Sequence, residues 1–346
     1  MTIHEAGMKL GLFSVLLPLL GAATAMAEGH DALVVTASNA TQNQLLVYST
    51  GGQLVQTVST QGKGGVSGNA GGIETNGSLV AVVNFGSQNV SILEREGDGL
   101  KFKYLVPSVT SPVSVAFGAG HLYILDTTKV ESHRIWGSDV SSTPDGVVTL
   151  LVADGSAAQV GVVENQLIIT EKSNMIETVD LASDGAVSGA AAKVQNIPSN
   201  VNTPFGLVTR GNDAYVTIAH ANEISLVRNG AILTITGSGT QSAPCWLTLV
   251  GSFLFSSNSP SSSVSRYAVY GQKIVQDAAV AAMLNGNPTD IASGAGLVAV
   301  IDGNGTVSHL SIFSVDEDGN LTLLQAADTL ATGANGVAIV RDEDED

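Results

Sequence analysis

The feature that most constrains the fold of this 346-residue chain is a pattern of short β-type segments that recurs seven times. Its clearest copy spans Thr203–Gly230, where runs rich in Val, Ile, Leu and Tyr predict strands at Phe205–Thr209, Ala214–Ala219 and Glu223–Arg228. Gly, Asn and Asp bound these runs, which is typical of short antiparallel strands. A sheet this small leaves one face bare, so the repeat predicts that each unit packs against neighbours of its own kind.

The second strand of each unit is a run of β-forming residues that leads into a polar residue. These runs begin at Leu33, Leu79, Leu122, Leu167, Ala214, Phe253 and Leu297. A third strand follows each of them, and then a glycine turn: Gly51-Gly52, Asp98-Gly99, Asp145-Gly146, Asp184-Gly185, Asn229-Gly230, Gly271 and Asp318-Gly319. Asn-Gly or Asp-Gly between two β runs indicates a hairpin, because both central residues of a type I′ turn need positive φ. Units of about 40–50 residues with four strands each predict an all-β chain, a seven-bladed β-propeller with four-stranded antiparallel blades.

The two ends of the chain complete each other in this pattern. The first unit, near Asp31, has a second strand but no first strand before it, and the C-terminal run Ala334–Val340 resembles the first strands that start at Pro112 and Pro204. We therefore expect the C-terminal strand to close the first blade, which would leave no open sheet edge in the ring. The predicted organisation is a signal peptide at residues 1–27, a propeller at residues 28–341 and an acidic tail at residues 342–346.

The N-terminal segment has the pattern of a secretory signal. Lys9 precedes the apolar run Leu10–Leu20, and the small-residue site Ala25-Met26-Ala27 follows before Glu28. The apolar run is too short to span a bilayer. We therefore expect a secreted or periplasmic protein that is not inserted into the membrane.

Composition excludes several classes of partner. A net charge of −17 is unsuited to nucleic acid or to anionic membrane surfaces, both of which require clustered Lys and Arg. A single cysteine, Cys245, excludes an internal disulfide framework, so stability must come from packing. We expect a monomer whose partner is a small-molecule substrate or an extracellular ligand.

The topology of a propeller predicts where a site would lie. The loops that enter the inner strands and the loops that follow the second strands surround the same mouth of the central channel. The candidates that these loops supply are His220 and Glu171 as catalytic residues, and Asn84, Asp126, Asn258, Asp290, Asp302 and Asn335 as substrate-binding residues. His220 and Glu171 would act as general acid and base near pH 7.

These residues also allow plainer interpretations. Asn and Asp at strand ends commonly bond the backbone of the next turn. The carboxylates of Asp126, Glu171, Asp290 and Asp302 could together hold Ca²⁺, which takes oxygen ligands, but no single loop has the spaced carboxylates of a dedicated calcium site. No other cofactor is expected. Cys245 is expected to be a buried, inert thiol rather than a nucleophile.

The blade sequences also resemble a known family. The stretches TPFGLVTRGNDAYVTIAHANEISLV and APCWLTLVGSFLFSSNSPSSSVSRYAV, with the closing ANGVAIV, resemble the lactonase family of seven-bladed propellers, which includes 6-phosphogluconolactonases and carboxymuconate-cyclizing enzymes. The resemblance covers nearly the whole predicted mature chain and rests on blade-forming residues. It implies a lactonase-like or cyclase-like enzyme, a hydrolase in the first case, that acts on a small lactone or related organic acid at the channel mouth. The alternative is a non-enzymatic extracellular propeller that binds a protein or carbohydrate through its polar rim.

Overall fold

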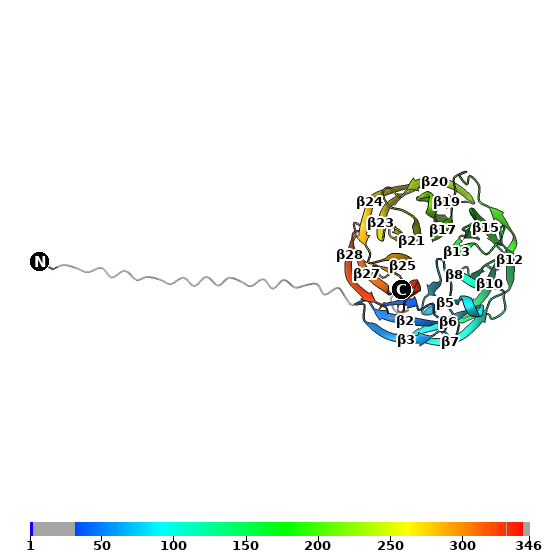
Figure 1. Ribbon diagram of the computed structural model, residues 1–346, viewed down its shortest axis with the longest axis horizontal. Helices are drawn as coiled ribbons and strands as arrows, with labels where there is room; N and C mark the ends of the chain where they lie inside the picture. The colour runs from blue at the N-terminus through cyan, green and yellow to red at the C-terminus, as the bar shows by residue number, and fades with distance from the viewer. Residues whose placement is uncertain (3–31, 330, 342–346) are drawn as a thin grey trace. The chain divides into compact units, whose positions relative to one another are not determined.

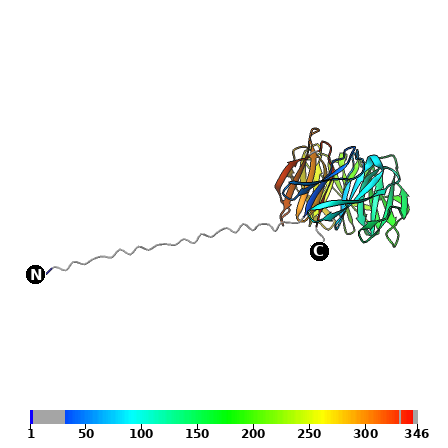
Figure 2. The same ribbon diagram turned by 90° about the horizontal axis from the view of Figure 1, so that it is seen from below.

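Seven β-sheets surround a common axis in the computed structural model, which describes residues 1–2, 32–329 and 331–341 (Figure 1). Apart from residues 1–2, the predicted signal peptide lies outside the described residues, and so does the predicted acidic tail. We number the sheets as blades 1 to 7 in chain order. Seen from the side in Figure 2, the blades stand next to one another as a ring of sheets. None of the helices in the described ranges is long and apolar enough to cross a membrane.

Each blade has an inner, a second, a third and an outer strand. From blade 1 to blade 7, the inner strands are β29 (Asn335–Val340), β4 (Ile73–Asn76), β8 (Pro112–Gly118), β13 (Ala157–Val163), β17 (Pro204–Arg210), β21 (Pro244–Val250) and β25 (Asn287–Gly294). The second strands are β1 (Leu33–Ala37), β5 (Leu79–Asn84), β9 (His121–Asp126), β14 (Gln166–Glu171), β18 (Asp213–Ile218), β22 (Phe253–Asn258) and β26 (Leu297–Gly303). The third strands are β2 (Gln44–Ser49), β6 (Asn89–Glu96), β10 (Lys129–Trp136), β15 (Met175–Leu181), β19 (Glu223–Arg228), β23 (Ser263–Tyr270) and β27 (Ser308–Val315).

The outer strands are β3 (Leu54–Ser59), β7 (Gly99–Pro107), β11 (Asp139–Val140) with β12 (Gly146–Thr149), β16 (Val187–Lys193), β20 (Ala231–Gly237), β24 (Lys273–Met283) and β28 (Leu321–Asp328). Two short 3₁₀ turns, η1 (Phe85–Ser87) and η2 (Ala219–Ala221), follow second strands. All the strand pairs within the blades are antiparallel, so the predicted seven-bladed all-β fold is confirmed.

Burial explains why the second strands are almost continuously apolar. Every residue of β5, β9 and β18 is buried, because each blade packs between two others and both faces of its sheet are covered. Val35 and Val47 of blade 1, for example, share one core cluster with Val80 and Leu93 of blade 2. The outer strand β3 instead alternates between partly buried and exposed residues, as expected for a strand that borders solvent.

The C-terminal strand completes blade 1, as the sequence predicts. β29 pairs with β1 in an antiparallel register that places Leu33 opposite Val340. The hydroxyl of Thr36 donates to the carbonyl of Gly336 at 2.7 Å and fixes this register from within the blade. The two ends of the described propeller therefore lie in one sheet, and the ring has no gap between its first and last blades.

Blade 3 departs from the predicted repeat. The turn between β10 and its outer strand lies at Gly137, with φ of 60°, so the prediction of a hairpin turn at Asp145-Gly146 is wrong. The outer strand is split into β11 and β12, which both pair with β10, and Pro144 lies in the break. Proline has no N–H to offer the sheet, which explains the interruption.

Candidate functional site

A cavity of about 360 Å³ lies at the centre of the propeller, and the inner strands of all seven blades line it. Its walls combine apolar side chains, such as Ile73, Leu207 and Ile291, with hydroxyl groups and two carboxylates. A concave space with a few converging polar groups is the usual setting of a small-molecule site. This cavity is therefore our candidate functional site.

One end of the cavity is covered by residues Asn69–Gly72, which we call the cap segment. The N–H of Ala70 donates to the carbonyl of Ala158 on blade 4 at 3.2 Å, and the indole N–H of Trp246 on blade 6 donates to the carbonyl of Asn69 at 3.0 Å. The side chain of Asn69 is fully buried and donates to the carbonyl of Val113 on blade 3 at 2.7 Å. Because three blades hold it, the cap segment lies across the centre of the ring.

Two further contacts hold the cap segment and Gly68, the residue that precedes it. The carbonyl of Gly71 accepts the N–H of Val115 at 2.9 Å, and Gly71 itself lines the cavity as part of its floor. The ammonium of Lys172 donates to the carbonyl of Gly68 at 2.6 Å, and burial lowers the pKa of this lysine. Lys172 directly follows the second strand β14, and the loops after the second strands are those predicted to surround an open channel mouth. The cap segment therefore covers the face on which we expected that mouth.

The exposure of the inner strands shows where the cavity opens. In β17, Leu207 is buried, whereas Val208 and Thr209 are partly exposed. In β25, Ile291 is buried, whereas Ala292 and Ser293 are partly exposed. Exposure thus rises along both of these strands away from the cap segment, so the cavity opens at the face where β17 and β25 end.

Asp290 is the first of the two carboxylates in the cavity. It is 5% exposed, and its Oδ1 and Oδ2 accept the backbone N–H groups of Ile291 at 2.9 Å and Val337 at 3.3 Å. Burial raises the pKa of Asp290 to about 7, against the opposing effect of these two hydrogen bonds. The bond to Val337 joins blade 7 to blade 1, and the two bonds together hold the carboxylate in one position.

Glu74, on β4, is the second carboxylate. Burial, and after it the negative charge of Asp290, raise the pKa of Glu74 to about 8, although a hydrogen bond with the backbone of Thr75 acts to lower it. Glu74 is partly exposed to solvent because it borders the cavity, yet protein surrounds it. Between about pH 7 and pH 8, these pKa values favour an ionised Asp290 beside a protonated Glu74.

Neutral polar groups complete the lining. The amide oxygen of Gln159 accepts the N–H of Leu207 at 2.6 Å, which leaves the NH₂ group of Gln159 available as a donor. Nearer the opening, the hydroxyl of Thr248 donates to that of Ser293 at 2.7 Å. The lining contains no Lys, Arg or His. Arg210, which ends β17 on the open face, directs its guanidinium to the carbonyl of Gly251 and the hydroxyl of Tyr215.

The residues predicted to be catalytic lie outside this cavity lining. Glu171 is fully buried, and its two carboxylate oxygens accept the N–H groups of Val152 and Ala153, each at 3.1 Å. His220 is exposed on η2, and its Nδ1 lies 2.8 Å from the hydroxyl of Thr203. No contact joins His220 to Glu171 in the described part of the chain. These contacts favour a structural role for Glu171, and the acid–base role of the pair stays a prediction.

Of the six predicted substrate-binding residues, Asp290 alone lines the cavity. Four others have their polar atoms bonded within the protein. Asn84 bonds Asn89 and Ser91 of its own blade, and also Asn43 and Thr60, which flank strands of blade 1. Asp126 accepts the N–H groups of Thr110, Thr128 and Lys129, Asn258 bonds Ser256, Ser263 and Ser265, and Asp302 bonds His309. Asn335 begins β29 and is partly buried. Bonding of the local turns and strands, the plainer interpretation, accounts for the contacts of these four residues, and their role in substrate binding stays a prediction.

The described residues also contain no group of three or more His, Cys, Asp or Glu side chains placed to hold a metal ion. The four carboxylates considered for Ca²⁺ do not form such a group, and Ca²⁺ binding stays a prediction. Cys245 is partly exposed, so the prediction of a buried residue is wrong, but desolvation by the surrounding protein raises the pKa of its thiol to about 12, which fits the expected inert thiol.

Glu74 is the residue that the sequence reasoning missed. It pairs with Ala81, the third residue of β5. The inner-strand residues that pair with the third residue of the other second strands are Ala116, Gly161, Val208, Thr248, Ala292 and Ala338. An acidic residue where the repeat otherwise has uncharged ones was the available signal. An alignment of the inner strands would have found it.

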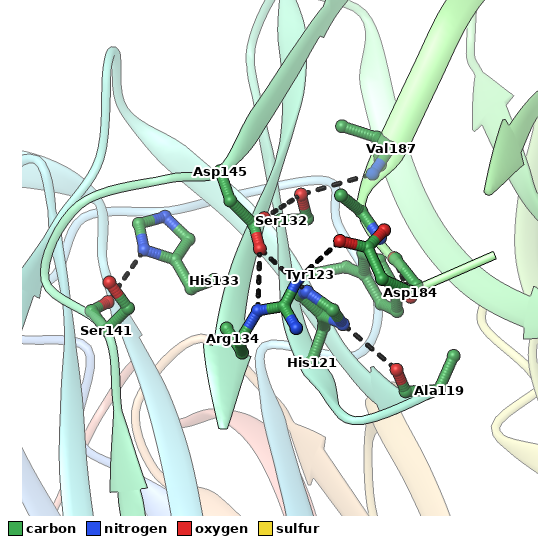
Figure 3. A network of polar contacts seen from close by, with 12 residues as sticks. Ala119, His121, Tyr123, Ser132, His133, Arg134, Ser141, Asp145, Asp184 and Val187 are labelled. Atoms are coloured by element: carbon green, nitrogen blue, oxygen red, sulfur yellow. Dashed lines mark hydrogen bonds and ion pairs between the residues drawn. The ribbon is translucent and has the colours of Figure 1, made fainter. Parts of the chain in front are cut away.

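A second polar cluster, in blade 3, resembles a catalytic triad in composition but not in arrangement (Figure 3). The hydroxyl of Ser132 donates to Asp145 at 2.6 Å, and Nε2 of His121 lies 2.9 Å from the other oxygen of Asp145. The carboxylate thus lies between serine and histidine, whereas a nucleophilic serine needs the histidine beside it. Arg134 bonds both Asp145 and Asp184, so this cluster ties blade 3 to blade 4.

Strand topology and central cavity together define a seven-bladed β-propeller whose inner strands enclose a cavity. Among solved structures, the chain is similar to a putative 6-phosphogluconolactonase from Bacteroides fragilis (TM-score 0.63, 12% identity, 90% of this chain and 98% of that chain covered). It is also similar to the periplasmic gluconolactonase PpgL of Pseudomonas aeruginosa (0.64, 14%, 90% and 99%) and to a functionally unknown protein from Desulfotomaculum acetoxidans (0.67, 13%, 90% and 99%).

At these identities, the similarity shows the shared fold, and it confirms the predicted resemblance at that level. A scan of family models and a search of curated proteins found no match.

Proposed function

We propose that this protein hydrolyses a small lactone in the central cavity, with Asp290 as general base and Glu74 as general acid. The observation that carries this proposal is the carboxylate pair, whose pKa values of about 7 and about 8 lie near physiological pH in an enclosed cavity. The similarity in fold to a gluconolactonase and to a putative 6-phosphogluconolactonase supports the choice of a lactone as substrate.

The pair can divide the proton transfers of hydrolysis. Ionised Asp290 takes a proton from a water molecule, whose oxygen attacks the lactone carbonyl carbon. The NH₂ group of Gln159 donates to the carbonyl oxygen as negative charge develops there. The bond between the carbonyl carbon and the ring oxygen then breaks, and protonated Glu74 gives its proton to that oxygen. The product is an open-chain hydroxy acid, and transfer of the proton from Asp290 to Glu74 resets the pair.

We further propose that this reaction takes place outside the cytosol. The predicted signal peptide at residues 1–27 supports this, as does the similarity in fold to a periplasmic gluconolactonase. Cell fractionation followed by N-terminal sequencing should find a protein that begins near Glu28 outside the cytosol. Recovery of the uncleaved chain in the cytosol would contradict the proposal.

The activity can be tested with the purified protein and glucono-1,5-lactone, by recording acid release in a pH-stat at about pH 7.5 against the spontaneous rate. Asp290→Asn and Glu74→Gln should each lower kcat by about 10²–10⁴-fold, the usual contribution of a general acid or base. Glu177→Gln is the matched control, because burial raises the pKa of Glu177 to about 7 but the residue lies outside the cavity lining.

Two further variants separate the cavity from the covered face. His220→Ala and Glu171→Gln should retain activity if the cavity is the site. Loss of turnover in His220→Ala, with full turnover in Asp290→Asn, would move the site to the covered face. Absence of hydrolysis of any lactone by the folded protein would favour the non-enzymatic alternative, a propeller that binds its partner through its rim.

A further inference from the structure

We propose that the cavity selects uncharged lactones over anionic ones and that the same charge expels the product. This inference rests on the proposed lactone hydrolysis and adds the class of substrate. Two features of the molecule support it: the negative charges of the cavity lining, and the cap segment that closes one end so that a ligand enters and leaves by the other.

The charges that line the cavity are all negative or titrate to negative. Asp290 and Glu74 are the ionisable residues of the lining, and no cationic side chain accompanies them. Arg210 is held by Gly251 and Tyr215, and Arg341, exposed after β29, does not contribute to the lining. The net charge of −17 adds a long-range repulsion of anions.

Because the cap segment closes one end of the cavity, substrate and product pass the same negatively charged lining. It covers one end of the cavity with a buried Asn69 and Ala70, so ligands must pass the opening near Thr209 and Ser293. A narrow space with protein on all sides is screened less than an exposed surface, so a like charge inside it is repelled more strongly. An anionic lactone would therefore be disfavoured at each step of entry.

Hydrolysis itself changes the charge of the ligand. A sugar lactone is neutral, but the carboxylic acid that it yields has an ordinary pKa far below 7 and ionises. A carboxylate beside ionised Asp290 is unfavourable, and this repulsion favours release through the opening by which the lactone entered. We therefore expect weak inhibition by the product as well as discrimination against anionic substrates.

The first test compares kcat/KM for glucono-1,5-lactone and for its 6-phosphorylated form, at low and at high salt, together with inhibition by gluconate. The neutral lactone should be preferred by about tenfold or more at low salt, the preference should shrink as salt rises, and gluconate should inhibit only at concentrations above KM. Equal or better hydrolysis of the phosphorylated lactone would overturn the inference and leave the proposed function standing. Failure to hydrolyse either lactone would overturn both.

The second test places a cation near the opening. Thr209→Lys should raise kcat/KM for the phosphorylated lactone relative to the neutral one by about tenfold and should strengthen inhibition by gluconate. Thr209→Gln is the matched neutral control and should leave the ratio unchanged. The same ratio in both variants would overturn the inference. If Thr209→Lys does not fold, as judged by circular dichroism, Thr75→Lys with Thr75→Gln gives the same comparison from β4.

Discussion

Glu74 links the chemistry of the cavity to the stability of the fold. Its pKa in the folded protein is about 8, well above the usual 4.5, because burial and the charge of Asp290 disfavour the ionised form. Between these two values the folded state binds more protons than the unfolded state, so this residue makes the protein less stable as pH rises. The penalty is absent below about pH 4.5 and complete above about pH 8.

Glu74→Gln should therefore stabilise the protein at alkaline pH. After a discount for the partial exposure of Glu74, we expect a gain of about 1–3 kcal/mol at pH 8.5, seen as a higher Tm, and almost no gain at pH 4.5. Glu317→Gln, at an exposed turn, is the control and should leave Tm unchanged at both values. A gain that is the same at the two pH values would show that Glu74 does not titrate between them.

The same pair predicts the pH dependence of turnover. kcat/KM should follow a bell-shaped curve with limbs near pH 7 and pH 8, because the reaction needs an ionised Asp290 and a protonated Glu74. In the Asp290→Asn variant, the pH curve of the residual kcat/KM should lack the acidic limb. A rate that is flat from pH 6 to pH 9 would contradict the assignment.

At the scale of the element, the cap segment sets the floor of the cavity through Gly71. Its φ is +61°, and an added Cβ would lie 3.0 Å from Nε2 of Gln159 and 3.0 Å from the hydroxyl of Ser114. Gly71→Ala should therefore displace the amide of Gln159 and lower kcat/KM by about tenfold or more, through the misplacement of a catalytic group. The comparison is made with glucono-1,5-lactone.

Gly97→Ala provides a matched control for Gly71→Ala. Gly97 has nearly the same φ, +59°, but an added Cβ would meet nothing within 4 Å. Both variants should lose similar stability, of about 1 kcal/mol, through the strain of a left-handed alanine. Equal kcat/KM in the two variants would show that the floor of the cavity has no part in turnover.

At the scale of the whole molecule, the closure of the ring depends on the last strand. Removal of residues 333–346 takes away β29, which pairs with β1 and carries the buried Val337 and Ile339. The truncated protein should aggregate or lose most of its stability, because β1 would be left with a bare edge and the inner strands β4 and β25 would lose the strand packed between them. Removal of residues 342–346 alone should leave Tm unchanged. A normal Tm for the longer truncation would contradict the closure.

Far more of the fold than of the site could be predicted from the sequence. Turns such as Asn229-Gly230 and the β-forming runs are local signals that recur in each unit, so the number of blades could be predicted by counting them. The closure could be predicted because the C-terminal run resembles the other first strands. The turn proposed at Asp145-Gly146 failed because the chain already turns back at Gly137, and Gly146 begins β12, which pairs with β10. Asp290 was among the predicted residues, but Glu74 and the covered mouth depend on how seven inner strands and the cap segment meet.

The pairing of β29 with β1 has a consequence for the order in which the molecule can be made. A ribosome delivers the chain from its N-terminus, so β1 emerges long before its partner, Asn335–Val340, since 300 positions separate the bonded residues Thr36 and Gly336. Until then, one edge of β1 has no strand to pair with, and the circle of blades cannot be completed. A nascent chain therefore stays incompletely folded until Val340 has been synthesised. If the predicted signal peptide directs export, this delay keeps the chain in a state that can still be threaded through a narrow translocation pore.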